Sequence, residues 1–163
     1  MIPQEIVTEI QQELSQLQIN VTNTDFTRPW GGFFVLDEAD ADKFIAEFFP
    51  TYKKEDLMLG NKLSPKILVV GPEQRLSWQY HHRRAEIWRV VRGEIGVVMS
   101  ETDEQTELNY FEPGDVIVLN KGQRHRLVGL DGWGIVAEIW QHTNTEHPSD
   151  EDDIVRLEDD FGR

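Results

Sequence analysis

Residues 66–88 read KILVVGPEQRLSWQYHHRRAEIW, and their pattern indicates the architecture of the whole chain. An apolar run ends at a Gly-Pro turn and is followed by a second segment with a strand-like pattern. Residues two apart in a strand face the same side, so Gln79 and His81 can reach one point. A turn through 82–85 brings the chain back, and Glu86 then opens the next strand beside them. The stretch therefore predicts a pair of strands with converging polar side chains.

A second stretch, residues 114–129, completes this group of polar side chains. It reads GDVIVLNKGQRHRLVG, and it places His125 at the start of a strand, directly after a turn. One amide oxygen, one carboxylate and two imidazoles form a mixed nitrogen and oxygen ligand set. Such a set suits Zn²⁺, Mn²⁺, Fe²⁺, Co²⁺ or Ni²⁺ and does not discriminate among them. We therefore expect one divalent metal ion on Gln79, His81, Glu86 and His125.

The remaining pattern predicts short strands with Gly-rich turns between them, which is typical of an all-β sandwich or barrel. Two amphipathic helices are expected over 3–17 and 40–48, and 51–65 is expected to be loop. The tail after Asp150 could form a last helical turn or lie extended. The strands are expected at 33–36, 67–70, 76–82, 87–92, 96–100, 110–111, 116–119, 125–128 and 135–140. The inner wall of the barrel is assigned to Val90, Val97, Ile117 and Leu127.

Composition restricts the class of protein. The 163 residues predict one domain, and the absence of cysteine excludes disulfides, thiolate metal sites and a cysteine nucleophile. A net charge of −14 argues against nucleic acid or an anionic membrane as a partner. Half of the 16 Lys and Arg residues fall between Arg75 and Arg126, where an anionic small molecule could be held. No membrane span or signal peptide is recognisable, so a cytoplasmic location is expected.

Two motifs in these stretches resemble those of the cupin superfamily. The first reads Gln79-x-His81, four residues, Glu86, six residues, Gly93. The second runs from Gly114 through Asn120-x-Gly122 to His125. The chain departs from the superfamily pattern where Glu73 replaces glycine, Gln79 replaces the first histidine and Asn120 replaces proline. The resemblance implies a jelly-roll β-barrel spanning 26–145, preceded by a helical extension over 1–25 and followed by a docked tail over 146–163.

The closer resemblance is to type II phosphomannose isomerases. Residues 66–88, the Arg28-Pro29-Trp30-Gly31 segment and the tail EDDIVRLEDDFGR at 151–163 carry it. It covers about 26–36 and 64–163, and it departs at Ile87, where that family usually has histidine, and over 142–150. Many members carry a nucleotidyltransferase domain upstream, and only the isomerase part is expected in this chain.

That resemblance implies interconversion of mannose 6-phosphate and fructose 6-phosphate through an enediol. The metal would polarise the carbonyl, a general base would move the proton, and cationic groups would hold the phosphate. Glu138, Lys66 and Arg163 are the catalytic candidates, and His82 is a further candidate base. For the substrate we expect Arg84 and Arg126 to bind the phosphate, and Ser77 and Trp88 to shape the pocket. Pairing of barrels through their sheets suggests a homodimer.

Other functions remain open at this point. The chain could be a non-catalytic sugar-binding or regulatory cupin, or an isomerase for another sugar or sugar phosphate. An Fe²⁺-dependent cupin oxygenase is a third possibility, although those sites usually contain more histidine. Substrate turnover separates the isomerase from the binding protein, and oxygen uptake with added iron separates it from the oxygenase.

Overall fold

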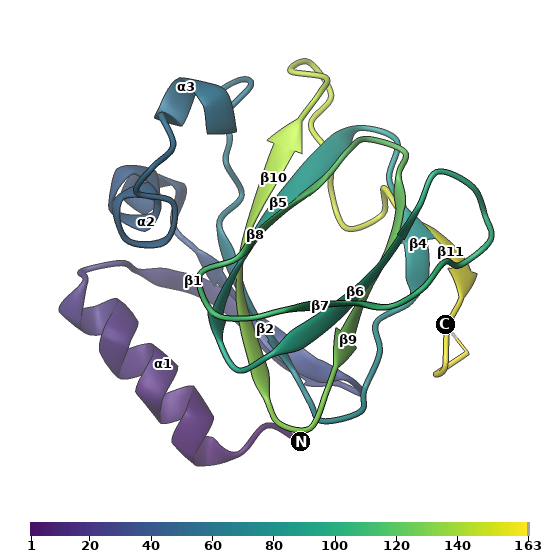
Figure 1. The fold of residues 1–163 in the computed structure, drawn as a ribbon. Coiled ribbons are helices and arrows are strands. Elements are labelled where there is room, and N and C mark those ends of the chain that lie inside the picture. Colours follow the sequence, from purple (N-terminus) through teal and green to yellow (C-terminus); the bar gives the residue numbers. More distant parts are fainter. Residues whose placement is uncertain (163) are drawn as a thin grey trace.

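The structure, a computed structural model, describes residues 1–162 and forms a β-barrel with helices packed against one side (Figure 1). Strands and helices follow the pattern of apolar residues closely. The helical elements are α1 (Gln4–Gln16), the 3-10 turn η1 (Glu38–Asp40), α2 (Ala41–Phe48) and α3 (Lys54–Leu57). The strands are β1 (Val21–Arg28), β2 (Gly31–Leu36), β3 (Lys66–Val70), β4 (Trp78–Tyr80), β5 (Arg84–Arg92), β6 (Ile95–Ser100), β7 (Asn109–Phe111), β8 (Val116–Leu119), β9 (Arg124–Gly129), β10 (Gly134–His142) and β11 (Val155–Glu158).

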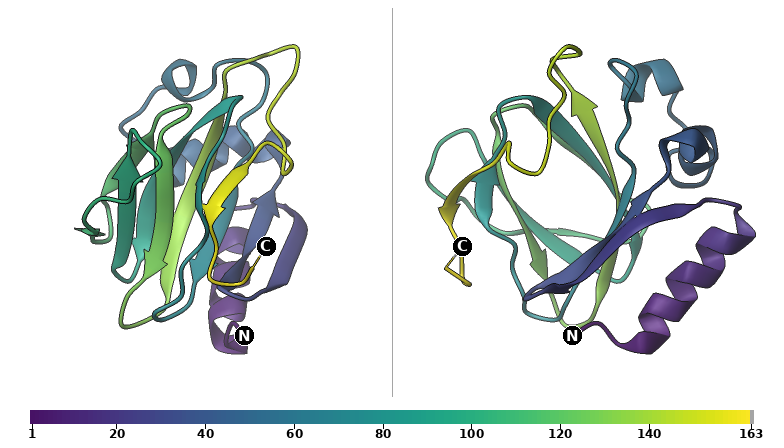
Figure 2. Two further views of the ribbon diagram at one scale, coloured as in Figure 1. Left: turned by 90° about the vertical axis from the view of Figure 1, so that its right-hand side faces the viewer. Right: turned by 180° about the vertical axis from the view of Figure 1, so that it is seen from behind.

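The strands form two antiparallel sheets that face each other. One has the order β1-β2-β3-β10-β5-β8 and the other the order β11-β4-β9-β6-β7. The sheets enclose a core that contains all four residues assigned to the inner wall, Val90, Val97, Ile117 and Leu127. The predicted all-β barrel is therefore confirmed. The C-terminal strand β11 lies beside β4, on the side of the barrel away from α1 (Figures 1 and 2).

The middle of the larger sheet is buried on both faces. Leu68 of β3 and Val136 of β10 point into the barrel, while Ile67 and Ile139 on the same strands pack in the core beneath the helices. Every residue of β3 is buried for this reason. Glu138 shares the inward face with Val136, since the two are two positions apart on β10. A carboxylate is thus placed inside the barrel by strand alternation alone.

The helices cover the outer face of the larger sheet (Figure 2). Ile10 and Leu14 of α1 and Phe44 and Phe48 of α2 contribute to that outer core. The periodic spacing of these residues gives each helix one apolar face, which is what packing on a sheet requires. The helices predicted over 3–17 and 40–48 are confirmed.

Three elements differ from expectation or extend it. Strand β1 begins at Val21, inside the segment expected to be a helical extension, and it was not predicted because its exposed edge position leaves no apolar alternation. Helix α3 forms a single turn within the expected loop 51–65. Of the two conformations considered for the tail, the extended one is found, because β11 pairs with β4.

Gly129, the last residue of β9, is held against another part of the backbone. A Cβ atom at this position would lie 1.8 Å from the carbonyl oxygen of Gly71. The Gly129 N–H donates to the carbonyl of Gln74 at 2.7 Å, which ties the strand to the loop after β3. A side chain larger than hydrogen would therefore force these backbone segments apart.

We expect Gly129→Ala to lower the free energy of unfolding by roughly 1 to 3 kcal/mol, because overpacking against backbone cannot be relieved by a rotamer change. Denaturant titration measures this. Gly132→Ala is the matched control, since a Cβ there meets nothing within 4 Å. Equal stability of the two variants would show that the close approach of Gly129 and Gly71 is not a packing constraint.

Candidate metal centre

A cavity of about 90 Å³ lies between the two sheets and holds most of the residues that the sequence predicted for the site. Both sheets and the C-terminal tail contribute to its walls. The predicted residues that line it are Lys66, Ser77, Gln79, Arg84, Glu86, Trp88, His125 and Glu138. His81 is in direct contact with several of them through its Nε2 atom.

Three buried side chains converge at the inner end of this cavity. His125 Nε2 lies 2.8 Å from Glu86 Oε2, and His81 Nε2 lies 3.3 Å from the same oxygen. The potential ligand atoms of His81, Glu86 and His125 all lie within 4.8 Å of one another. No more than 3% of any of the three residues is exposed. The group has the size of a metal site and is shielded from bulk water.

The strands bring these residues together in a simple way. Gln79 of β4 pairs directly with His125 of β9, and Glu86 lies on β5 in the opposite sheet. His81 follows β4 by one residue, and its carbonyl accepts a hydrogen bond from Gly122 N in the turn before β9. Backbone pairing and a backbone hydrogen bond therefore join the two motifs, and their side chains project into one end of the barrel.

Hydrogen bonds on the far side of each imidazole direct the Nε2 lone pairs toward the centre. His81 Nδ1 lies 2.7 Å from the carbonyl oxygen of Asp153, and His125 Nδ1 lies 3.3 Å from that of Gln123. A carbonyl oxygen only accepts, so each Nδ1 must carry the proton. This is the arrangement that metal-binding histidines use, because it leaves Nε2 free to coordinate.

Glu86 supplies a negative charge to the same point. Burial alone would raise the pKa of Glu86, but Arg84 and protonated His81 and His125 hold it well below its usual range. A metal ion would supply the same positive charge next to neutral imidazoles. The Oε2 atom of Glu86 is buried without a hydrogen-bond donor among residues 1–162. A carboxylate oxygen that faces two imidazole lone pairs is unfavourable unless a cation lies between them. The donor set therefore fits a divalent ion, and His81, Glu86 and His125 could hold one.

Gln79 lies at the edge of this group. Its Nε2 atom is 3.4 Å from His81 Nε2 and 3.5 Å from His125 Nε2, while its Oε1 atom accepts from Ser77 Oγ. Rotating the amide by half a turn would present Oε1 to the centre, and the Ser77 hydroxyl could then accept from Nε2. Ser77 thus contacts the predicted fourth ligand instead of merely shaping the pocket.

Glu138 lies beside Glu86 on the inward face of the neighbouring strand. The pairing of β10 with β5 places Trp140 opposite Glu86 and Glu138 opposite Trp88. The indole N–H groups of Trp88 and Trp140 donate to its two oxygens at 2.9 and 2.8 Å. Burial, together with the nearby charge of Glu86, raises the pKa of Glu138 to about 8. A carboxyl group with such a pKa can exchange a proton near neutral pH.

Cationic side chains surround the rest of the cavity. Lys66 lies with its ammonium 3.8 Å from the centre of the Trp140 ring, and Arg84 stacks on the same ring at 3.6 Å. Arg84 also donates to Ser149 Oγ and to the carbonyl of Asp150, so much of its hydrogen-bonding capacity is used by the tail.

Arg28 and Arg156, which the sequence analysis did not assign to the site, line the cavity as well. Arg28 lay within the quoted Arg-Pro-Trp-Gly segment, which was the available signal for it.

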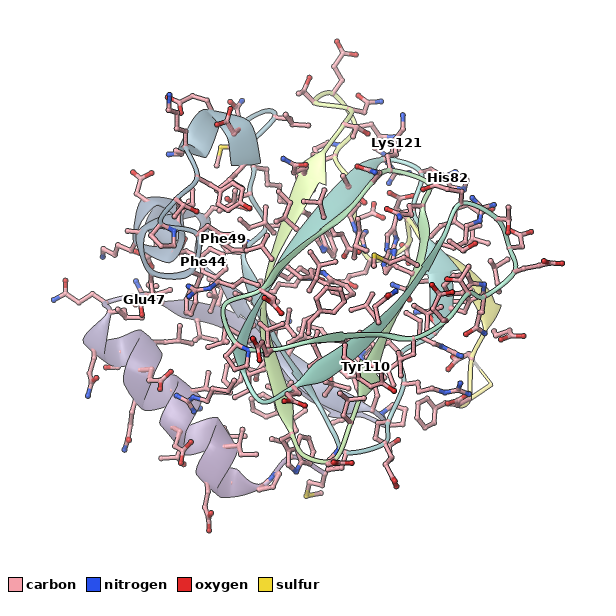
Figure 3. All side chains as sticks on the ribbon, in the orientation of Figure 1. Phe44, Glu47, Phe49, His82, Tyr110 and Lys121 are labelled. Carbon is pink, nitrogen blue, oxygen red and sulfur yellow. The ribbon has the colours of Figure 1, made fainter. Side chains whose placement is uncertain are left out.

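Two predicted site residues do not lie at this cavity. Arg126 is on the opposite face of β9 from His125, because adjacent residues of a strand alternate. Its Nε donates to the carbonyl of Leu76, and its guanidinium faces Glu158 and Asp160. The expectation that Arg126 binds phosphate is therefore not supported by its position. His82, labelled in Figure 3, is exposed and does not line the cavity, so its position does not support a role as the base. Arg163 lies outside the described residues.

Asp153, which the sequence analysis missed, anchors the tail to the site. Its carboxylate accepts from the backbone N–H groups of His82 and Arg83, each at 2.9 Å, and from Ser149 Oγ at 2.6 Å. Its carbonyl accepts from His81, as described above. These hydrogen bonds overcome the effect of burial and lower the pKa of Asp153 to about 2. The tail therefore fixes the orientation of His81.

Comparison with known proteins agrees with this geometry. Residues 15–159 match the sequence model of the family described as mannose-6-phosphate isomerase C-terminal. The alginate biosynthesis protein AlgA of Pseudomonas aeruginosa is 32% identical over 136 residues, which is 83% of this chain and 22% of AlgA. The xanthan biosynthesis protein XanB of Xanthomonas campestris is 29% identical over 136 residues, 83% of this chain and 23% of XanB. The chain thus spans less than a quarter of the length of these relatives.

Solved structures show the same fold. CapF of Staphylococcus aureus, a capsular polysaccharide assembling protein, superposes with a TM-score of 0.54 over 83% of this chain and 34% of its own, at 14% identity. Vicilin of hazelnut, Corylus avellana, superposes with a TM-score of 0.56 over 85% of this chain and 36% of its own, at 18% identity. The cupin barrel expected from the motifs is confirmed. No helix within residues 1–162 is both long and apolar enough to cross a membrane.

We expect the purified protein to bind about one divalent ion per chain, and the double variant His81→Ala/His125→Ala to lose it. Two of the converging nitrogen ligands are then absent, while the apolar core that closes the barrel is intact. Metal analysis after dialysis, with circular dichroism to verify folding, measures both properties. His82→Ala/His147→Ala removes two exposed histidines and is the matched control. Full occupancy of the His81/His125 variant would contradict the assignment.

We expect Asp153→Asn to lower the free energy of unfolding by roughly 2 kcal/mol at neutral pH, because charge-assisted hydrogen bonds are lost. The pKa of Asp153 is lowered from 3.8 to about 2, so its contribution is complete above about pH 4. It is lost as the pH falls through 2. The difference in the free energy of unfolding between parent and variant should therefore become smaller below pH 4. Asp152→Asn, at an exposed neighbour, is the control, and a pH-independent difference would refute the argument.

Proposed function

The chain belongs to the mannose-6-phosphate isomerase C-terminal family, and from this premise we propose that it is a metal-dependent aldose-ketose isomerase acting on mannose 6-phosphate and fructose 6-phosphate. The observation that carries the proposal is the buried group of His81, Glu86 and His125 with the buried carboxyl of Glu138, whose pKa is raised to about 8, beside it. A Lewis acid site next to a general base is what an enediol reaction requires.

The proposal gives each residue a specific task. An ion held by His81, Glu86, His125 and Gln79 would polarise the carbonyl of the open-chain sugar. Glu138 removes the proton from the carbon next to the carbonyl and returns it to the former carbonyl carbon. The proton of the neighbouring hydroxyl passes to the former carbonyl oxygen, so no net proton is gained or lost. The indoles of Trp88 and Trp140 hold both oxygens of Glu138 and fix the direction from which it approaches.

The environment of the cavity supports this chemistry. Glu138 is only 4% exposed, so water competes little for the proton that it carries. Arg84, which stacks on Trp140, offsets the negative charge that develops on the substrate oxygens. Tail residues Glu151, Ile154 and Arg156 line the cavity as well.

A second candidate function is a cupin of the same site that binds a sugar phosphate without turning it over. The departures from the family pattern at Ile87 and over 142–150 favour this alternative. A coupled assay with mannose 6-phosphate and with fructose 6-phosphate separates the two functions. Binding of either sugar phosphate by the metal-loaded protein, with no interconversion, would replace the isomerase by the binding protein.

We expect Glu138→Gln to reduce kcat by roughly 10²- to 10⁴-fold while the bound metal is retained, because general-base catalysis contributes about that much. The parent protein should gain activity as the pH rises, since the base must be deprotonated. A cation on Glu86 would cancel part of the repulsion that raises the pKa of Glu138. The rising part of the pH–rate profile should therefore have its midpoint below pH 8. Rates measured from pH 5 to 9 verify this, with Glu112→Gln as control. Unaltered kcat in Glu138→Gln would exclude it as the base.

A further inference from the structure

Lys66 presents a buried ammonium group to the wall of the cavity. It lies on β3 directly opposite Glu138 of β10, and it is only 6% exposed. Its Nζ atom lies 3.8 Å from the centre of the Trp140 ring and 5.2 Å from that of Phe33. A buried lysine normally requires a charged or hydrogen-bonding partner, so the identity of that partner is informative.

The partner is a side chain that the rest of the fold does not hold in place. Within residues 1–162, the one ion pair of Lys66 is with Glu151, whose Oε1 lies 2.5 Å from Nζ. The Glu151 side chain is 63% exposed, in contrast to the 7% of Lys66. No other hydrogen bond or ion pair is formed by the Glu151 carboxylate among these residues. The contact joins a fixed cation inside the cavity to an anion that can rotate into solvent.

The backbone beside Glu151 is anchored independently of this ion pair. The carbonyl of Asp150 accepts from the Arg84 guanidinium, and its carboxylate accepts from the backbone N–H of Asp152. The carboxylate of Asp153 accepts from a backbone N–H in the turn between β4 and β5. Rotation of the Glu151 side chain about its staggered torsions would therefore release Lys66 without undocking the tail. The energetic cost of such a movement is small compared with unfolding a strand.

A movement of this kind would enlarge the cavity. Glu151 is one of the residues that line it, and about 90 Å³ is small beside the roughly 300 Å³ at which sites for small molecules usually begin. Arg28 and Arg156 line the same cavity, and the Nε atom of Arg28 is paired with the carboxylate of Asp25 at 3.0 Å. A ligand with two negative charges could use these guanidinium groups as well as Lys66, whereas the single carboxylate of Glu151 is bound to Lys66 alone.

We propose that Lys66 is the anion-binding subsite of the cavity and that Glu151 occupies it as an internal competitor until a phosphate-bearing ligand displaces it. The phosphate ester then replaces the carboxylate on Lys66, and the Glu151 side chain turns outward and enlarges the cavity. This rests on the proposed function only in expecting a phosphosugar as the ligand. No covalent bond is made or broken in the exchange.

The test is the affinity of the metal-loaded protein for inorganic phosphate, fructose 6-phosphate and fructose, measured by isothermal titration calorimetry. In most molecules of the parent protein, Glu151 would occupy Lys66. Removing this competitor raises the apparent affinity for phosphate by the reciprocal of the fraction of molecules in which Lys66 was free. Glu151→Gln should therefore bind inorganic phosphate and fructose 6-phosphate roughly tenfold more tightly than the parent. The affinity for fructose should change less.

Asp152→Asn is the matched control, because it removes the same charge from an exposed neighbour that has no ion pair among the described residues. Its affinity for phosphate should stay within about twofold of the parent. The substitution removes only a long-range repulsion between an exposed carboxylate and phosphate, and salt screens that repulsion. In a Lys66→Met background, Glu151→Gln should produce no gain. Equal gains in Glu151→Gln and Asp152→Asn, or a gain that persists without Lys66, would overturn the proposal.

These outcomes are independent of catalysis. A protein that shows the phosphate gain in Glu151→Gln but no interconversion of sugar phosphates retains the subsite and loses the isomerase assignment. A protein that interconverts the sugar phosphates but shows no gain in Glu151→Gln retains the isomerase assignment and loses the subsite.

Discussion

The rest of the site depends on one buried carboxylate, that of Glu86, which faces two imidazole nitrogens and has no hydrogen-bond donor for Oε2 among the described residues. Such a charge is costly inside a barrel unless a cation compensates it. The barrel supplies the geometry for that cation by pairing β4 with β9 across from β5. The carbonyls that hold the two Nδ1 atoms then determine which nitrogen of each ring faces the centre.

The C-terminal tail is the second constraint, because it is part of the site and not an addition to it. Asp153 holds the turn between β4 and β5 through its carboxylate and holds His81 through its carbonyl. Arg84 is oriented by Ser149 and Asp150 in the same segment. Glu151 pairs with Lys66 at the wall of the cavity. One short segment thus contacts both the candidate ligand His81 and the cationic side chains of the cavity.

Much of the site could be predicted from the sequence because strand alternation is a reliable rule. It places Gln79 with His81, and it places Glu138 on the inward face of β10 between two apolar neighbours. The same rule puts Arg126 on the face opposite His125, so its assignment to phosphate stays a prediction that its position does not support. Asp153 could not be recognised in this way. It lies in a run of acidic residues, and nothing in that run distinguishes the one carboxylate that is buried.

Strand β1 shows the corresponding limit for the fold. Its residues are mostly exposed, so they carry no apolar period, and only pairing with β2 defines the strand. Arg28 and Arg156 reach the cavity through β1 and through the tail, which are the two segments where local pattern is weakest. Residues that meet through long-range pairing at an edge are thus the ones that a single sequence reveals least.

The most direct test of the central claim is a crystal structure of the protein soaked with Mn²⁺ or Zn²⁺, with anomalous diffraction recorded at the metal edge. We expect one strong anomalous peak at distances of about 2.0 to 2.2 Å from His81 Nε2, His125 Nε2 and a Glu86 carboxylate oxygen. The Oε1 atom of Gln79 should face the same peak. A structure with no peak at this point, and with a proton shared between Glu86 and an imidazole in its place, would contradict the account.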